Sequence, residues 1–118
     1  MYKRQDQGGI LLTNFPVGGF LSYENLKELR EDISVARVIG QANGGPAVDY
    51  TVNCALGVPY MTGPESLGDE PVNHVLPAWD LLAGAYTAFA ILAAERRRRE
   101  TGQGADVRIP LSLSLIHI

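Results

Sequence analysis

Short apolar runs alternate with glycine-rich stretches in the first half of the chain. Residues 10–13 are apolar and partly β-branched and predict a buried strand, and residues 35–39 predict a second one. Between these runs, apolar residues recur at helical spacing from Ser22, a suitable helix cap, to Glu31. The pattern therefore predicts a β-α-β unit with two parallel strands, and ligands usually bind at the carboxyl ends of such strands.

The second half of the chain predicts three further elements. Residues 47–56 favour a short helix that ends before Gly57, and residues 57–79 favour an irregular connection because they are rich in proline and glycine. Residues 80–99 predict a long helix, and residues 107–111 alternate as a third strand. The fold class that follows is α/β, a partial Rossmann-like parallel sheet with crossover helices.

The predicted helix from Asp80 to Arg99 has one broad apolar face. That face is made of Leu81, Leu82, Ala85, Tyr86, Phe89, Ala90, Leu92 and Ala93. A face of this width is typical of a helix that other parts of the protein cover, so we expect this helix to be buried. Its alanines and Gly84 permit close packing against a sheet or another helix. The basic residues 96–99 suit the negative pole of the helix. We expect a solvated helix end there, because four consecutive helical residues spread over all faces and form no stripe for nucleic acid.

The composition excludes several classes of partner. The chain has 118 residues, 46% of them hydrophobic, which is enough for one compact domain. A formal net charge of −3 provides no basic excess for nucleic acid or an anionic membrane surface, and no apolar run is long enough to cross a bilayer. The single cysteine, Cys54, cannot form an internal disulfide, and no cysteine–histidine cluster has zinc spacing. We therefore expect a soluble, cytoplasmic protein without a structural metal.

Three residues are candidates for chemistry, and each has a structural alternative. Asp80 begins the long helix after Trp79. It is either an ordinary helix cap, which is the commoner case, or a nucleophile held at a helix N-terminus. Cys54 is predicted to be a small buried thiol rather than a nucleophile. His74 either bonds to loop backbone or orients a substrate carboxylate.

Three segments around Asp80 resemble the class III CoA-transferases of the CaiB/BaiF type. They are residues 72–84, 93–104 and 107–112. In that family an aspartate begins a helix rich in small residues. The helix closes with a basic stretch and a Thr-Gly-x-Gly turn, as residues 101–104 do here. The resemblance extends approximately from residue 9 to residue 112 and implies that Asp80 is the catalytic aspartate.

The resemblance also assigns residues to the substrates. Asn14 and Phe15 look like the family's Asn-Phe pair near CoA, and Tyr50 looks like the tyrosine that follows its glycine loop. His74 and Trp79, which precede the aspartate, would contact the acid substrate. The family's basic residue after Asn-Phe has no counterpart here, since a Pro-Val-Gly-Gly loop stands in its place, so one CoA contact is not accounted for.

The implied reaction moves CoA from an acyl-CoA thioester to a carboxylic acid through an aspartyl-CoA thioester on Asp80. Amides at the helix end and in nearby loops would stabilise the oxyanions. CoA is itself a substrate, no metal or tightly bound cofactor takes part, and the full-length parent would be a homodimer. Residues 47–53, 62–65 and 71–80 are similar to a branch that moves CoA between the two carboxyls of one dicarboxylic acid.

The arginine end, residues 96–99, leaves open a use on a membrane surface or on RNA. Two further alternatives stay open beside that branch. The first is transfer of CoA between two separate acids. The second belongs to a different class of function, a non-catalytic α/β binding module in which Asp80 is only a helix cap and the glycine loops are simple turns.

Chain length suggests a division into two parts. Members of the family are several hundred residues long, so residues 1–112 are expected to be a fragment of the large CoA-transferase domain, inactive by itself. Residues 113–118 read like the translation of a transposon end used as an adapter in DNA-sequencing libraries. We expect this segment not to be biological, and His117 is left out of the functional argument for this reason.

Overall fold

The structure, a computed structural model, describes residues 9–16 and 18–114. Its helices and strands follow the order β1 (Ile10–Thr13), α1 (Tyr23–Leu29), β2 (Ser34–Ile39), α2 (Asp49–Ala55), α3 (Ala78–Thr101) and β3 (Asp106–Pro110). Short 3-10 turns lie at Gly19–Leu21, Val58–Met61, Glu65–Leu67 and Leu111–Leu113. The α/β fold expected from the sequence is confirmed, with small differences at the ends of the elements.

The three strands form one parallel sheet in the order β1-β2-β3. β2 is the central strand, and its Ala36 pairs with Leu12 of β1 and with Val107 of β3. The first half of β2 is the most buried part of the sheet, since Val35 is fully buried. Because the strands all run in one direction, their carboxyl ends meet at the same edge of the sheet.

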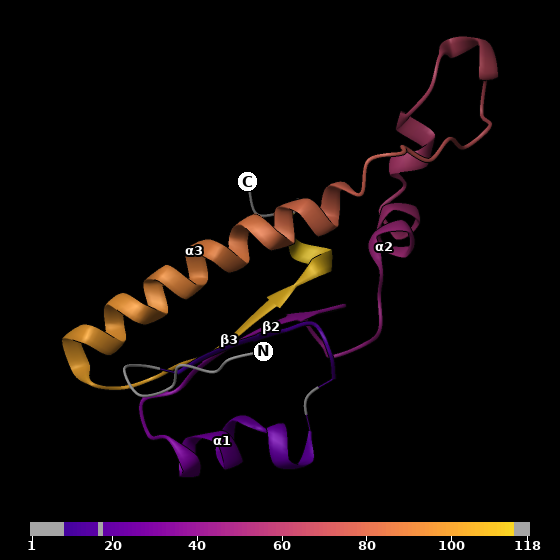
Figure 1. The fold of residues 1–118 in the computed structure, drawn as a ribbon. Coiled ribbons are helices and arrows are strands. Elements are labelled where there is room, and N and C mark those ends of the chain that lie inside the picture. The colour runs from indigo at the N-terminus through magenta and orange to yellow at the C-terminus, as the bar shows by residue number, and fades with distance from the viewer. Residues whose placement is uncertain (1–8, 17, 115–118) are drawn as a thin grey trace.

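Helices lie on both sides of the sheet. Figure 1 shows α3 along one side and α1 on the other. α2 and the connection that leads to α3, residues 56–77, extend beyond the carboxyl ends of the strands and give the molecule an elongated outline of 59 × 28 × 27 Å. α2 contacts α3 and lies near the beginning of that helix, beyond the carboxyl edge of the sheet.

Two glycines shape the return from α3 to β3. Gly102 ends α3 with φ +73°, and its N–H donates to the carbonyl oxygen of Arg98 at 2.7 Å. Gly104 lies so close to Ile33 that a Cβ on residue 104 would fall 1.8 Å from the carbonyl oxygen of Ile33. Position 104 requires glycine because the backbone of Ile33 leaves no room for a Cβ. Position 102 favours glycine because its φ is positive.

α3 packs on the sheet with small residues. Its buried residues are Trp79, Ala83, Thr87 and Ala94. Phe89 and Leu92, by contrast, are 69% and 67% exposed, and Leu81 is 56% exposed. The expectation that the whole broad face is buried is therefore wrong for the described part of the chain, whereas close packing through alanines is observed as expected. Small side chains let the helix lie closer to the strands, and the larger ones point away from the sheet.

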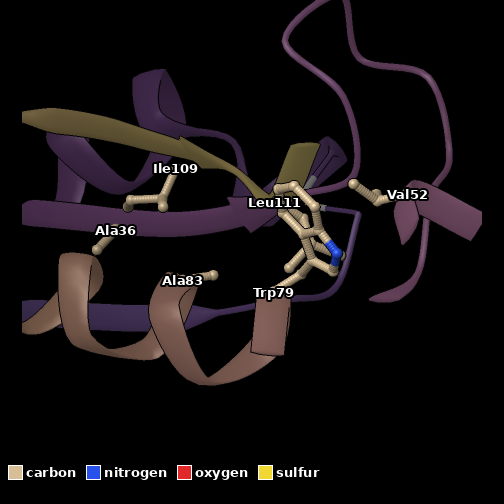
Figure 2. Close-up of a cluster of buried hydrophobic side chains, with 6 residues drawn as sticks. All are labelled: Ala36, Val52, Trp79, Ala83, Ile109 and Leu111. Atoms are coloured by element: carbon tan, nitrogen blue, oxygen red, sulfur yellow. The ribbon is translucent and has the colours of Figure 1, made fainter. Parts of the chain in front are cut away.

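One hydrophobic cluster joins the sheet, α2 and α3. It consists of Ala36, Val52, Trp79, Ala83, Ile109 and Leu111. Figure 2 shows Trp79 on the first turn of α3, in the same cluster as Leu111 from the end of β3, with Val52 approaching from α2. The first turn of α3, which also carries Asp80, is therefore held against the hydrophobic core.

Cys54 is exposed on α2, so the expectation of a buried thiol is wrong. α2 turns Asp49, Val52 and Asn53 inward, and Cys54 follows directly on the outer side of the helix. Residue type does not predict which side of α2 is buried, because the polar Asn53 is fully buried and the neighbouring Cys54 is exposed.

The basic end of α3 is only partly solvated. Arg96 and Arg99 are exposed, as expected. Arg98 differs, because its guanidinium lies 2.8 Å from a carboxylate oxygen of Asp32 and 2.7 Å from one of Glu95, and its side chain is 16% exposed. The expectation of a uniformly solvated helix end is therefore wrong for Arg98, which connects α3 to the turn before β2.

The segment expected to be adapter-derived is described only in part. Residues 115–118, and with them His117, lie outside the described residues. Ser114 is buried, and its Oγ lies 2.9 Å from the carbonyl oxygen of Leu111. Within residues 9–16 and 18–114, no helix is long and apolar enough to span a membrane. The same residues contain no group of three or more histidine, cysteine, aspartate or glutamate side chains placed to hold a metal ion.

Candidate active site

A cleft of about 850 Å³ opens at the carboxyl ends of β1 and β2. Asn14 and Phe15, which follow β1 directly, form part of its wall. The loop after β2 and one side of α2 contribute Gly40, Gln41, Gly44, Gly45, Pro46, Ala47, Val48, Thr51, Val52, Ala55 and Leu56. Gly40 lets this loop fold back tightly, since a Cβ there would fall 2.2 Å from the backbone nitrogen of Ala47. The segments that follow the two strands therefore meet in one largely apolar cleft.

Asp80 is the third residue of α3, which begins at Ala78 after Pro77. No side chain at the cap position bonds to the helix, and Asp80 itself does not cap it. The prediction that Asp80 is the cap of the long helix is therefore wrong. Its side chain is exposed and forms no hydrogen bond or ion pair with the other residues that the structure describes. A carboxylate in this position is accessible to a substrate.

The cap of α3 comes from Asp49, the first residue of α2. The N–H groups of Trp79 and Asp80 donate to Asp49 Oδ2 at 2.8 and 3.2 Å. Asp49 is 3% exposed, and its other carboxylate oxygen has no hydrogen-bond partner among the described residues. Sequence reasoning missed this residue. One indication of its role was present in the sequence, since Asp49 is an acidic residue between Ala47 and Val52, in a segment expected to form a helix.

All the amides of the first turn of α3 are already bonded. The N–H of Ala78 donates to the carbonyl oxygen of Leu76 at 2.8 Å, and the N–H of Leu81 donates to that of Pro77 at 3.1 Å. Asp49 takes the two amides between them. The expectation that amides at this helix end stabilise an oxyanion is therefore wrong for this geometry, and an oxyanion needs donors from elsewhere.

Further hydrogen bonds hold the Trp79 side chain and backbone. The indole N–H donates to Asn53 Oδ1 at 3.4 Å, and the Asn53 amide group donates in turn to Asn73. The Ser114 hydroxyl also lies 3.1 Å from the carbonyl oxygen of Trp79, but Ser114 belongs to the segment expected to be adapter-derived and is not counted in the support of this turn. Asn53 is fully buried, so this end of α3 is held by polar contacts as well as by the hydrophobic cluster.

The remaining candidates do not share one surface. Tyr50 is half exposed on α2 and is not among the residues that line the cleft, unlike Asn14 and Phe15. His74 lies on the connection before α3, and its Nδ1 is buried without a hydrogen-bond partner among the described residues. Trp79 is 2% exposed, so its indole packs in the core instead of forming an open substrate surface.

The structure thus has a parallel sheet with a cleft at its carboxyl edge and an exposed aspartate at the start of a helix that packs on the sheet. The family described as CoA-transferase family III matches residues 8–118. Because this match covers nearly the whole sequence, the chain belongs to CoA-transferase family III. The resemblance drawn from the segments around Asp80 is thereby confirmed, and family membership favours an enzyme over a non-catalytic module.

One curated relative is similar over most of this chain. Over 106 residues the chain is 51% identical to 2-methylfumaryl-CoA isomerase from Chloroflexus aurantiacus. The match covers 90% of this chain and 26% of that protein. The chain thus spans about a quarter of the length of this relative.

Solved structures share the fold. A CaiB/BaiF family protein from Brucella suis superposes with a TM-score of 0.77 at 25% identity, over 89% of this chain and 30% of its own. A hypothetical protein from Mycobacterium tuberculosis superposes with a TM-score of 0.76 at 20% identity, over 89% of this chain and 33% of its own. At 20% and 25% identity, the similarity supports the fold, that is, the arrangement of the sheet and helices.

Proposed function

We propose that the full-length protein containing this chain is a CoA-transferase in which Asp80 is the nucleophile. The observation that carries the proposal is an exposed carboxylate on the first turn of α3, held in place by its neighbours and without a partner among the described residues. Family membership supplies the reaction class. Residues 1–112 form part of the large domain of that protein, and residues 113–118 are adapter-derived.

The reaction exchanges CoA between two carboxylates in covalent steps. The Asp80 carboxylate attacks the thioester carbonyl, and the C–S bond breaks to give a mixed anhydride and CoA thiolate. The thiolate then attacks the aspartyl carbonyl, which releases the donor acid as its carboxylate and leaves an aspartyl-CoA thioester. The acceptor carboxylate attacks this thioester and expels the thiolate. The thiolate finally attacks the acceptor carbonyl, which forms the new acyl-CoA and restores Asp80.

CoA binds in the cleft at the carboxyl edge of the sheet, and Asn14 and Phe15 contact it there. The cleft is mostly apolar, which suits the pantetheine arm of CoA. Tyr50 contacts CoA from the outer side of α2 only if the ligand extends past the cleft, since its side chain does not line it. His74 orients the acid substrate, and Trp79 contributes by packing beneath the nucleophile.

Intramolecular transfer is the finer form of the proposal. The relative at 51% identity is named 2-methylfumaryl-CoA isomerase, and the segments at 47–53, 62–65 and 71–80 led to the same branch. The substrate is then one dicarboxylic acid whose two carboxyls exchange CoA. The full-length protein works as a homodimer in the cytoplasm, where a reducing environment keeps the CoA thiol and Cys54 reduced.

The test is mass spectrometry of the full-length protein after incubation with an acyl-CoA and hydroxylamine. A hydroxamate on the peptide that carries Asp80 is expected in the wild type, because hydroxylamine attacks both the anhydride and the thioester. Asp80→Ala should lack this adduct and lose turnover by about 10⁴-fold or more, as removal of a covalent nucleophile does elsewhere.

Asp69→Ala is the matched control. Asp69 is an exposed aspartate on the connection between α2 and α3, and its replacement should leave both the adduct and turnover unchanged. Turnover by Asp80→Ala at the wild-type rate, or an unmodified Asp80 in an active enzyme, would contradict the proposal.

A further inference from the structure

α2 has two sides with different contacts. The side that lines the cleft carries Val48, Thr51, Val52 and Ala55. Asp49 and Asn53, one helical turn apart, reach instead to the beginning of α3. One short helix therefore contacts both the proposed CoA cleft and the turn that carries Asp80.

Asp49 is an unusual residue for a buried position. Its carboxylate takes part in none of the ion pairs among the described residues, and one of its two oxygens has no hydrogen-bond partner there. A buried polar atom without a partner destabilises a fold, so packing alone does not account for an aspartate here. The contact that does account for it is the one with the positive pole of α3, where its other oxygen accepts two backbone N–H groups.

We propose that Asp49 is a positioning residue for Asp80, an inference that rests on the function proposed above. An aspartate in the first turn of a helix readily bonds to free N–H groups of its own helix. Asp49 occupies the N–H groups of Trp79 and Asp80, so the Asp80 carboxylate has no free amide on this turn to bind. Asp49 thereby fixes the first turn of α3 and keeps the nucleophile directed outward.

The shared helix gives this contact a further consequence. A thioester bound in the cleft touches α2 on one side, while Asp49 holds the nucleophile from the other. The same helix, α2, therefore positions both the Asp80 carboxylate and the bound thioester. Misplacement of a reacting group by about 1 Å can slow an enzyme by about 10²-fold, so loss of Asp49 should affect the chemical step far more than binding.

The test compares three variants of the full-length protein. Asp49→Leu keeps the approximate size of the side chain and removes the acceptor, and Asp49→Asn keeps an acceptor oxygen without the charge. Thr87→Ala is the matched control, since Thr87 is equally buried but its hydroxyl donates to the carbonyl oxygen of Ala83 within α3, about two turns beyond Asp80. The measurement is the single-turnover rate of hydroxamate formation at Asp80, together with KM for the acyl-CoA.

The expected pattern separates positioning from general stability. Asp49→Leu should slow Asp80 modification by about 10²-fold with KM nearly unchanged. Asp49→Asn should recover the rate to within about tenfold of wild type, because asparagine caps helices about as well as aspartate. Thr87→Ala should also lower the melting temperature, because it removes a buried hydrogen bond and a buried methyl group, while the rate in folded protein stays within about threefold of wild type.

Three results would overturn the inference. The first is a folded Asp49→Leu protein that modifies Asp80 at the wild-type rate, and the second is an equal loss of rate in Thr87→Ala. The third is a loss of about 10²-fold or more in Asp49→Asn, which keeps the acceptor oxygen, and this result decides by itself if Asp49→Leu does not fold. Absence of any adduct on Asp80 in the wild type would contradict the proposed function instead, so the two failures are distinguishable.

Discussion

Arg98 joins the far end of α3 to the turn before β2. It donates hydrogen bonds to Glu95 on its own helix and to Asp32 across the turn. The hydrogen bond from Arg98, followed by that from Arg99, lowers the pKa of Glu95 to about 2. The pKa of Asp32 is also lowered, mainly by its hydrogen bond with Arg30 and further by Arg98. Each carboxylate is therefore favoured in its charged form by the folded state.

This cluster predicts an acid-sensitive contribution to stability. Because the folded-state pKa of Glu95 lies below the ordinary value of 4.5, its contribution is complete above pH 4.5 and is lost as the pH falls toward 2. Arg98→Met in the full-length protein should lower the melting temperature near neutral pH and flatten its decline in acid. The measurement is thermal unfolding followed by circular dichroism from about pH 7 to about pH 3.

Arg96→Met is the control for this prediction. Arg96 forms an i,i+4 pair with Glu100 in which both side chains are exposed, and such surface pairs contribute little. Its pH profile should coincide with that of the wild type. Identical profiles for wild type and Arg98→Met would show that the cluster does not contribute.

At the scale of elements, the α3–β3 turn depends on close contact between backbones. Gly104 of this turn touches the backbone of Ile33 just before β2, so two segments far apart in sequence meet without room for a side chain. The turn sequence Thr-Gly-Gln-Gly contributed to the family resemblance, and its last glycine has a packing reason that the sequence alone does not reveal.

Gly104→Ala should therefore destabilise the full-length protein by roughly 2–3 kcal/mol, since the added Cβ overlaps backbone that must shift. Gly102→Ala serves as the comparison. Its Cβ would meet nothing within 4 Å, and only its positive φ opposes the substitution, at a cost of about 1 kcal/mol. Chemical denaturation of the two variants measures the difference, and equal losses would contradict the role of contact at position 104.

At the scale of the whole molecule, the chain exposes more large apolar side chains than a compact domain normally does. Phe15, Phe20, Phe89 and Leu92 are each more than two-thirds exposed, and so are Leu29, Tyr60, Met61 and Val75. Contiguous exposed apolar surface usually marks a contact with another part of a protein. Since the chain spans about a quarter of its curated relative, we expect residues outside this chain to cover the outer face of α3.

The isolated chain should consequently self-associate, and two charged substitutions test the reason. Phe89→Glu with Leu92→Lys should shift the isolated chain toward monomer, as measured by light scattering. The same pair should destabilise the full-length protein, where these side chains are expected to be buried. A wild-type chain that is monomeric and melts cooperatively by itself would contradict this expectation.

The sequence by itself determined the elements of this protein and the class to which it belongs. Apolar runs, glycine loops and helical spacing were sufficient for the parallel strands and for α3, because these signals are local. The resemblance placed Asp80 at the start of that helix, and strand direction placed Asn14 and Phe15 at the ligand edge. Both placements depend only on the order of strands, loops and helices along the chain, and periodicity and motifs predict that order directly.

Only the tertiary structure decided which groups contact the site residues. Asp49 caps α3 across 30 residues of sequence, and no local pattern connects two such positions. The sequence indicated that alanines allow α3 to pack closely, but it did not reveal that Phe89 lies on the exposed side. Hydrophobic spacing counts apolar side chains and not the distance at which they let a helix approach a sheet. Long-range contact and close packing are properties of the folded chain, and they decide how the candidate nucleophile is held.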